Sequence, residues 1–253
     1  MPWNPQQYLS YGNERLRPAL DLMARIKLAA PQGIVDIGCG PGNVTAILRE
    51  RWPDATITGI DNSPEMLNAA RKIDGIDWQL ADAATWQPER QYDLIFSNAA
   101  LHWLDQHEQL FPHLAQALNP GGCLAIQMPR NLASASHIIA REVAQSGPWR
   151  ETLALLLREA PVHEPADYYR ILTPRAEQLD IWETEYLHIL GGENPVADWT
   201  RGSLLVPLLA ALAEPQRSAF EAEYRRRLQA AYRAQADGQT LFPFRRIFII
   251  AVR

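Results

Sequence analysis

Two kinds of segment alternate along the first half of the chain. Short apolar runs of strand length lie at residues 34–35, 56–61, 76–81, 92–98 and 121–128. The stretches between them are long enough for helices and place their apolar residues at helical spacing. Apolar strands that alternate with helices are typical of a parallel sheet covered on both faces. The pattern therefore predicts an α/β fold with a doubly wound sheet, preceded by a helix over residues 13–27.

The alternation stops after the fifth of these runs. Residues 130–178 have a helical pattern that prolines break into short pieces, residues 179–190 alternate as a sixth strand does, and residues 194–237 are helical again. Residues 241–252 are rich in β-branched side chains and predict a closing strand. We therefore expect one domain over residues 1–253, with a seven-stranded sheet and two helical insertions, at 130–178 and 194–237, that cap its carboxyl edge.

A glycine-rich turn follows the first apolar run. Gly38, Gly40 and Gly42 alternate directly after Asp36, and a helix-like run comes next. Such a turn lets a ligand approach the backbone and points free N–H groups at it, although a tight turn that binds nothing has the same composition. A dinucleotide fingerprint would place its third glycine at position 43, which is Asn43. The G-x-G-x-G spacing resembles that of Rossmann-like S-adenosylmethionine-dependent methyltransferases.

Polar residues also end the following strands. Asp61 comes about 20 residues after the turn, where an acid accepts hydrogen bonds from a ribose diol. Asp82 follows the third strand and can accept from an adenine amino group, while Met66 lies either near the adenine or in the core. The predicted contacts with S-adenosylmethionine are Asp36, Gly38, Gly40, Gly42, Asp61, Asn62, Met66, Asp82, Ala83 and Asn98.

Composition narrows the possible functions. With 253 residues, of which 47% are apolar, the chain can bury a sizeable core. A net charge of −5 argues against a nucleic-acid partner. Cys39 and Cys123 are far apart, so neither a disulfide framework nor a metal site is predicted. We recognise no targeting segment or long apolar run, and we expect a cytoplasmic protein that binds no membrane. The oligomeric state is not predicted.

Beyond the glycine turn, the chain resembles the trans-aconitate methyltransferase family over almost its full length. The stretches that carry the resemblance are residues 3–5, Tyr8, 14–15, 17–18, 36–43, 57–61, 103–104, 110–114, 124–129, 141–144, 167–169, 180–182, Trp199 and 248–251. Members of this family are cytoplasmic enzymes that methylate a carboxylate of a small tricarboxylic acid. The resemblance implies a monomethyl ester and S-adenosylhomocysteine as products, with trans-aconitate as the expected acceptor.

Two positions depart from the family pattern. The family reads Gln-Met-Pro-Asp-Asn after the fifth strand, and this chain has Arg130 in place of the acid. The family also reads Thr-Gly-Leu-Arg-Pro before a helix in the second insertion, where this chain has Val206 in place of the arginine. Both changes concern recognition of an anionic acceptor. They leave open a different small carboxylic acid, or another small molecule, as the acceptor, and they do not affect the methyl donor.

Methyl transfer to a carboxylate needs little from side chains. The acid is already ionised at neutral pH, so no general base is required, and we predict no catalytic residue. The other carboxylates of the acceptor need arginine forks, tyrosine hydroxyls or indole N–H donors. The candidates for these contacts are Tyr8, Arg15, Arg130, Tyr168, Tyr169, Trp199 and Arg245. Each has a structural alternative: the two adjacent tyrosines fit core aromatics, and Arg15 fits an exposed helix face.

Three rival functions have less support. A nicotinamide dehydrogenase is disfavoured by the glycine spacing. A nucleic-acid amino-methyltransferase would have Asn/Asp-Pro-Pro-Tyr/Phe after the fourth strand, where residues 98–101 read Asn-Ala-Ala-Leu. A non-catalytic binding module is disfavoured by the intact glycines and acids. His102 lies where some methyltransferases keep a base, and we interpret it as packing or as a neighbour of the cofactor.

Overall fold

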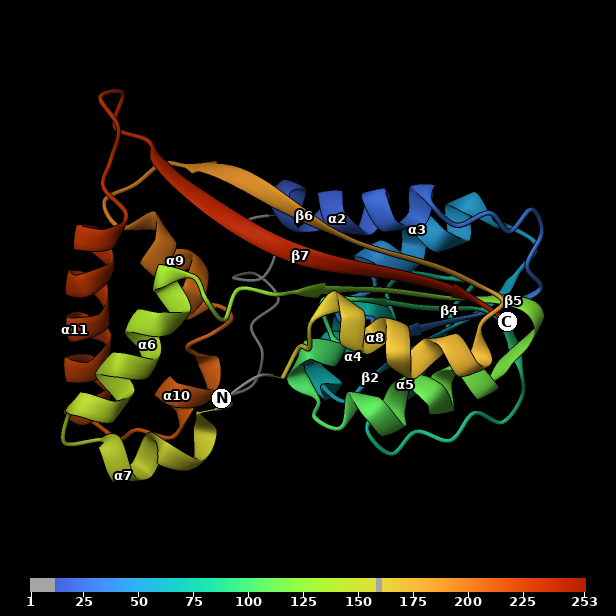
Figure 1. Cartoon of the computed structure of the whole chain (residues 1–253), viewed down its shortest axis with the longest axis horizontal. Coiled ribbons are helices and arrows are strands. Elements are labelled where there is room, and N and C mark those ends of the chain that lie inside the picture. The colour runs from blue at the N-terminus through green and yellow to red at the C-terminus, as the bar shows by residue number, and fades with distance from the viewer. Residues whose placement is uncertain (1–11, 158–160) are drawn as a thin grey trace. The chain divides into compact units, whose positions relative to one another are not determined.

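The computed structural model describes residues 12–157 and 161–253, with side chains from Leu16 onward. Its sheet has seven strands in the order β3-β2-β1-β4-β5-β7-β6 (Figure 1). The strands are β1 (Gly33–Ile37), β2 (Thr56–Asp61), β3 (Asp77–Leu80), β4 (Tyr92–Asn98), β5 (Leu118–Pro129), β6 (Gln178–Leu190) and β7 (Thr240–Val252). Strands β1 to β5 pair in parallel, and β7 is antiparallel to β5. The predicted doubly wound seven-stranded sheet is confirmed.

The strand order reverses between β1 and β4, and ligands of open α/β sheets bind beside such a switch point. The helices are α2 (Gly12–Ala24), α3 (Asn43–Arg51), α4 (Pro64–Ala70), α5 (His107–Gln116), α6 (Ala135–Ser146), α7 (Arg150–Leu153), α8 (Pro165–Leu172), α9 (Pro195–Arg201), α10 (Val206–Ala210) and α11 (Gln216–Ala231). Three 3₁₀ turns are η1 (Leu101–Trp103), η2 (Ala154–Leu156) and η3 (Thr173–Arg175). Within the described ranges, no helix has the length and apolar character that crossing a bilayer requires.

The chain forms two compact units. The larger unit contains β1 to β5, the helices α2 to α5 and α8, and the ends of β6 and β7 that pair beside β5. The smaller unit contains α6, α7, α9, α10 and α11 with the remaining residues of β6 and β7. Helix α8 falls inside the predicted insertion 130–178, yet it packs against α5 in the larger unit. That the helical segments cap an acceptor stays a prediction.

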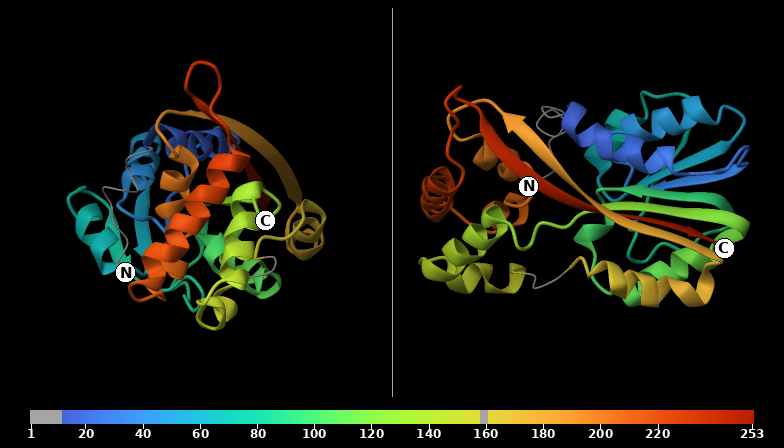
Figure 2. Two further views of the ribbon diagram at one scale, coloured as in Figure 1. Left: turned by 90° about the vertical axis from the view of Figure 1, so that its left-hand side faces the viewer. Right: turned by 45° about the horizontal axis from the view of Figure 1, so that its top comes forward.

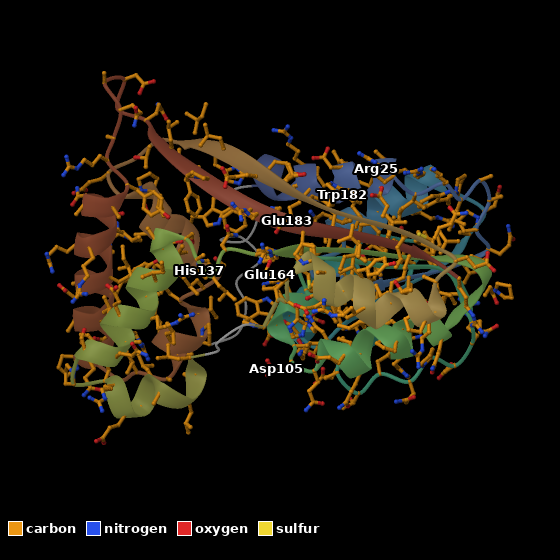
Figure 3. The ribbon with its side chains drawn as sticks, viewed as in Figure 1. Arg25, Asp105, His137, Glu164, Trp182 and Glu183 are labelled. Carbon is orange, nitrogen blue, oxygen red and sulfur yellow. The ribbon has the colours of Figure 1, made fainter. Side chains whose placement is uncertain are left out.

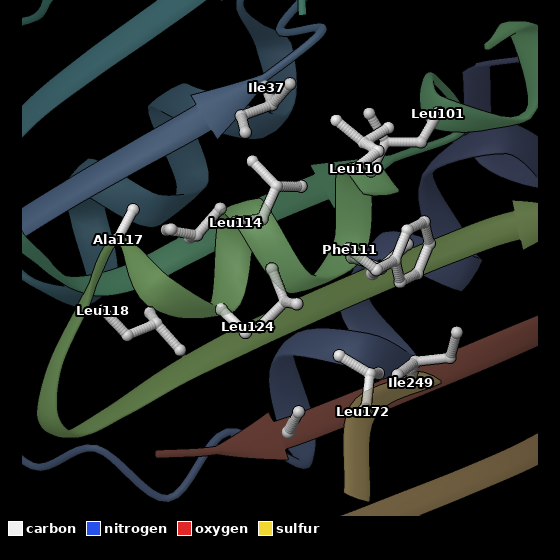
Figure 4. Packing of buried hydrophobic residues seen from close by; sticks show 14 of the residues in the cluster. Ile37, Leu101, Leu110, Phe111, Leu114, Ala117, Leu118, Leu124, Leu172 and Ile249 are labelled. Atoms are coloured by element: carbon white, nitrogen blue, oxygen red, sulfur yellow. The ribbon is translucent and has the colours of Figure 1, made fainter. Parts of the chain in front are cut away.

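Apolar side chains of alternate strand residues build the core of the larger unit. Ile37, Leu124 and Ile249 face α5 and α8, where Phe111 and Leu172 pack against them (Figure 4). Helices α2 and α3 lie on the opposite face of the sheet (Figure 2). Successive residues of a strand point to opposite faces, so each face receives its own set of side chains.

An aromatic stack joins the last two strands in the larger unit. The indole of Trp182 on β6 stacks on Phe248 of β7, with ring centroids 4.8 Å apart. The guanidinium of Arg25, just after α2, lies 5.1 Å from the centroid of the Trp182 ring (Figure 3). Arg25 also donates to Asp180 at 3.3 Å. These contacts connect the N-terminal helix with the edge strand of the sheet.

Candidate cofactor and acceptor site

The glycine turn between β1 and α3 has one open position. Gly38, Gly40 and Gly42 all have positive φ, at 72°, 57° and 84°. A Cβ atom on Gly38 would lie 2.1 Å from Cβ of Ala100, and one on Gly42 would lie 2.6 Å from the ring of Trp78. A Cβ on Gly40 would meet no atom of the described residues within 4 Å. Packing therefore requires glycine at the outer two positions, while at Gly40 the backbone faces open space that a ligand can enter.

The carboxylate of Asp61 ties this turn to the end of β2. It accepts from the backbone N–H of Gly40 at 2.8 Å and from that of Ser63 at 2.9 Å. Burial raises the pKa of Asp61, and hydrogen bonds from backbone N–H groups, including those two, oppose the shift. The backbone N–H of Asn62 is a third donor to this carboxylate. A carboxylate has about four acceptor positions, so one remains for a hydroxyl of a ribose.

Asp36 lies beneath the turn and is almost wholly buried. Thr45 on α3 donates its hydroxyl to the Asp36 carboxylate at 2.6 Å. Burial raises the pKa of Asp36 from its usual 3.8 to about 7; the Thr45 hydrogen bond opposes this shift and the nearby charge of Asp61 adds to it. Asp36 supports the turn from below, and its predicted contact with the cofactor stays a prediction.

The remaining predicted cofactor residues lie after β2 and β3. Asn62 and Asp82 are exposed, and Asp82 accepts from the backbone N–H of Ala84 at 2.9 Å. Ala83 is half-buried against the core. Met66 is buried, which favours the alternative in which it packs in the core. Its backbone N–H binds the hydroxyl of Ser63, the N-cap of α4, at 3.2 Å.

Asn98 ends β4 with an unsatisfied acceptor. Its Oδ1 atom is buried and has no hydrogen-bond partner in the described part of the chain. A buried acceptor without a donor is costly, so a donor from a bound ligand would be stabilising here. Together with the open position at Gly40 and the remaining acceptor position of Asp61, this atom fits a cofactor that carries ribose hydroxyls and an ammonium group, as S-adenosylmethionine does.

Among the predicted acceptor contacts, Arg130 and Arg245 lie next to one another in the smaller unit. The backbone N–H of Arg130 donates to the carbonyl of Arg245 at 2.9 Å. The side-chain amide of Asn131 accepts from the N–H of Arg245 at 2.8 Å and donates to its carbonyl at 3.0 Å. It thereby extends the β5–β7 ladder. The guanidinium of Arg245 pairs with Glu185 at 3.7 Å and is about half exposed.

Three other predicted acceptor contacts have different positions. Tyr8 lies outside the described residues, and so does the side chain of Arg15, whose backbone belongs to α2. Tyr169 is exposed on α8 of the larger unit. Their contacts with an acceptor stay predictions.

The side chains of Tyr168 and Trp199 are buried among aromatic and apolar side chains. Tyr168 is fully buried, and its hydroxyl lies 2.7 Å from Nδ1 of His107. Trp199 is 2% exposed and stacks on His188, beside Phe242. Burial favours the core role that was the alternative for Tyr168, and the contacts of both residues with an acceptor stay predictions.

A buried histidine and a buried polar pair were not among the predicted site residues. Nε2 of His107 lies 3.0 Å from the carbonyl of Leu101, so this nitrogen carries the proton and Nδ1 accepts from Tyr168. The contact attaches η1, which follows β4, to α5 and α8. Gln127 and Arg246 are also buried, although each lies in a strongly apolar run. The sequence signal for this pair is a polar residue that interrupts an apolar strand.

Comparisons with known proteins agree with this geometry. Residues 34–122 match a family described as "Methyltransferase domain". The chain is 46% identical to a trans-aconitate 2-methyltransferase of Azoarcus sp., over 99% of both chains. It is 48% identical to one of Streptomyces avermitilis, over 98% of this chain and 96% of the relative.

Solved structures support the fold. The YcgJ protein of Bacillus subtilis aligns with a TM-score of 0.61 at 14% identity, covering 94% of this chain and 98% of that one. A phosphoethanolamine N-methyltransferase 2 of Haemonchus contortus, solved with S-adenosylhomocysteine, aligns with a TM-score of 0.56 at 16% identity, over 93% and 52% of the two chains. By its identity with the curated relatives over nearly the whole chain, the protein belongs to the trans-aconitate 2-methyltransferase family.

Proposed function

We propose that this S-adenosylmethionine-dependent methyltransferase esterifies one carboxylate of trans-aconitate, giving a monomethyl ester and S-adenosylhomocysteine. One observation carries the proposal: the chain is 46% identical, over 99% of both chains, to a relative with the name of that activity. The open glycine turn and the acid at the end of β2 support it. A cytoplasmic location, as the family resemblance implies, is part of the same proposal.

The chain's own residues hold the donor. When bound, S-adenosylmethionine supplies an electrophilic methyl group on a sulfonium sulfur. We expect Asp61 to accept from a ribose hydroxyl and Asp82 to accept from the adenine amino group. The open backbone at Gly40 would admit the donor to the turn, and the unsatisfied Oδ1 of Asn98 would accept from its ammonium group.

No side chain has to remove a proton in this reaction. A carboxylic acid with a pKa of about 4 is ionised at neutral pH, so the nucleophile is ready. The reacting groups are an anion and a cation, and the step neutralises both charges, so exclusion of water favours it. The protein contributes mainly by aligning the oxygen, the methyl carbon and the sulfur at an approach of about 3 Å. His102 is therefore not required as a base.

The alternative acceptor is a different small carboxylic acid. The departures at Arg130 and Val206 favour this alternative, because both alter the charge available to an anionic acceptor. Arg130 adds a cation at the end of β5, and Val206 removes one at the start of α10.

A screen with labelled donor distinguishes the two candidates. The enzyme would be given trans-aconitate, cis-aconitate, citrate and succinate, with acetate as the monocarboxylate control, and kcat/KM would be measured for each. We expect the highest kcat/KM with trans-aconitate. A higher value with another di- or tricarboxylate would establish the alternative, and no labelling of any of these acids would contradict both.

A further inference from the structure

A buried polar pair joins β5, the last strand of the parallel run, to the antiparallel strand β7 in the larger unit. The side chains of Gln127 on β5 and Arg246 on β7 are 0% and 3% exposed. Nη1 of Arg246 donates to Oε1 of Gln127 at 3.4 Å. In the strand register Arg246 pairs with Pro129, the last residue of β5. The guanidinium is thus attached at the carboxyl end of β5, the end at which α/β sheets bind ligands.

Arg246 determines which way the Gln127 amide points. A guanidinium carries only donors, so the amide must turn its oxygen toward Arg246. The amide nitrogen of Gln127 then points away from the arginine. This Nε2 atom is buried and has no hydrogen-bond partner in the described part of the chain. A buried N–H group without an acceptor is costly, which indicates that an acceptor arrives with a ligand.

Asn98 indicates which ligand group fits beside Gln127 and Arg246. Asn98 on β4 and Gln127 on β5 are partners in the strand register, so their side chains lie on the same face of the sheet. Oδ1 of Asn98 needs a donor, whereas Nε2 of Gln127 needs an acceptor. A carboxylate is an acceptor only, so it matches Gln127 and Arg246 and is repelled by the Asn98 oxygen. The cationic donor fits on the Asn98 side and the anionic acceptor on the Arg246 side.

We propose that Arg246 and Gln127 recognise a carboxylate of the acceptor, Arg246 through its charge and Gln127 through its free amide N–H. The inference rests on the proposed function, because it names the residues that hold the same acceptor. It also differs from the sequence-based choice of Arg245. Neighbouring residues of a strand point to opposite faces, and the Arg245 side chain is half exposed beside Glu185. A guanidinium removed from water binds a carboxylate more strongly than one that remains exposed.

The test compares Arg246→Gln, Arg246→Lys and Gln127→Met with a control, Arg253→Gln. Met has nearly the volume and shape of Gln, so Gln127→Met removes the hydrogen bonds with little change in packing. Arg253 comes after the opposite end of β7 and donates to the carbonyl of Gln116 at 2.8 Å, so its variant removes the same charge elsewhere. For each variant the KM and kcat for trans-aconitate, the Kd for S-adenosylmethionine and the Tm would be measured.

A contact that is equal in the ground and transition states changes KM and leaves kcat unaltered. We expect Arg246→Gln to raise the KM about 10- to 100-fold and Gln127→Met about 10-fold, as loss of charge-assisted and ordinary hydrogen bonds does. Arg246→Lys should recover part of the loss, because an ammonium keeps the charge without the fork. The Kd for the donor should stay within about twofold in all variants, and Arg253→Gln should keep the wild-type KM.

Two failures are distinguishable. If wild-type protein methylates no polycarboxylate, the proposed function and this inference are both wrong. If wild-type protein does so and Gln127→Met and Arg246→Gln keep its KM, only this inference is wrong. Should Arg246→Gln not fold, Gln127→Met alone decides, since an unchanged KM in that variant overturns the assignment.

Discussion

The backbone N–H of Gly40 donates to Oδ2 of Asp61 at 2.8 Å, so the glycine turn after β1 and the acid at the end of β2 form one structure. The remaining acceptor position of that carboxylate is where we place the ribose of the methyl donor. Loss of the Asp61 carboxylate would remove a charged hydrogen-bond acceptor for S-adenosylmethionine. It would also remove the hydrogen bond that holds the glycine turn.

Asp61→Ala should therefore weaken binding of S-adenosylmethionine. A hydrogen bond to a charged group contributes about 1.5–3 kcal/mol, so we expect a Kd about 10- to 100-fold higher by calorimetry. Asp77→Ala is the matched control, because Asp77 is an exposed carboxylate on the neighbouring strand that accepts from Gln79. Equal donor affinity in Asp61→Ala and wild type would show that β2 does not hold the ribose.

Asp36 should make the folded protein less stable as the pH rises. Burial raises its pKa to about 7 in the folded state, against 3.8 in the unfolded chain, so the folded state binds the proton more tightly. The contribution of Asp36 to the free energy of unfolding is fully present below about pH 4 and is lost as the pH rises toward 7. The loss reaches about 4 kcal/mol, because each unit of pKa shift corresponds to about 1.36 kcal/mol.

Asp36→Asn should remove this dependence. The amide oxygen can still accept from Thr45, and no charge has to be buried. Without donor present, denaturant unfolding should find Asp36→Asn more stable than wild type at about pH 8 and little changed at about pH 4. A destabilised variant at pH 8 would mean that the folded protein stabilises the ionised carboxylate, and that the pKa of Asp36 is not raised.

Tyr168→Phe should affect stability and leave catalysis unchanged. The phenol hydroxyl lies 2.7 Å from Nδ1 of the buried His107, and the ring packs on Phe111. Removing one partner of a buried hydrogen bond costs about 1–3 kcal/mol, whereas the ring contacts are kept. Urea unfolding measures the loss, and steady-state kinetics measure the KM for trans-aconitate. A raised KM with an unchanged free energy of unfolding would show that Tyr168 contacts the acceptor, as the sequence predicted.

Much of the fold could be predicted from the sequence because its signals are local. Apolar runs and the glycine turn located β1 to β5 and the acids after them. Alternating residues located β6, and β-branched residues located β7. The burial of individual side chains could not be predicted in the same way. Nothing local distinguishes Tyr168, which is fully buried, from Tyr169, which is 56% exposed. The difference arises from the packing of α8 on α5, which depends on residues distant in the sequence.

The same limit applies to the arginines. Arg245 and Arg246 are adjacent and chemically identical, and only the register of β7 against β5 decides which of them is buried. Gln127 could have been noticed as a polar residue in an apolar strand. Its free N–H group, however, follows from the position of Arg246, which lies more than a hundred residues away in the sequence.

Arg130→Ala tests the departure from the family pattern after β5. Other members of the family have an arginine at the position of Val206, and we hypothesise that Arg130 recognises the carboxylate that this arginine holds there. In that case Arg130→Ala should raise the KM for trans-aconitate about 10-fold with little change in kcat. Arg130→Lys should recover part of the loss. Arg226→Ala is the control, because this exposed arginine pairs with Glu223 on α11. An unaltered KM in Arg130→Ala would separate Arg130 from acceptor recognition.

The chemical form of the product tests the central claim most directly. The protein would be incubated with methyl-labelled S-adenosylmethionine and trans-aconitate, and the labelled product would be treated with mild alkali. An ester releases all of its label as methanol, so we predict complete release, with one S-adenosylhomocysteine formed for each labelled product. Label that withstands alkali, or S-adenosylhomocysteine formed without labelled product, would contradict methyl transfer to a carboxylate.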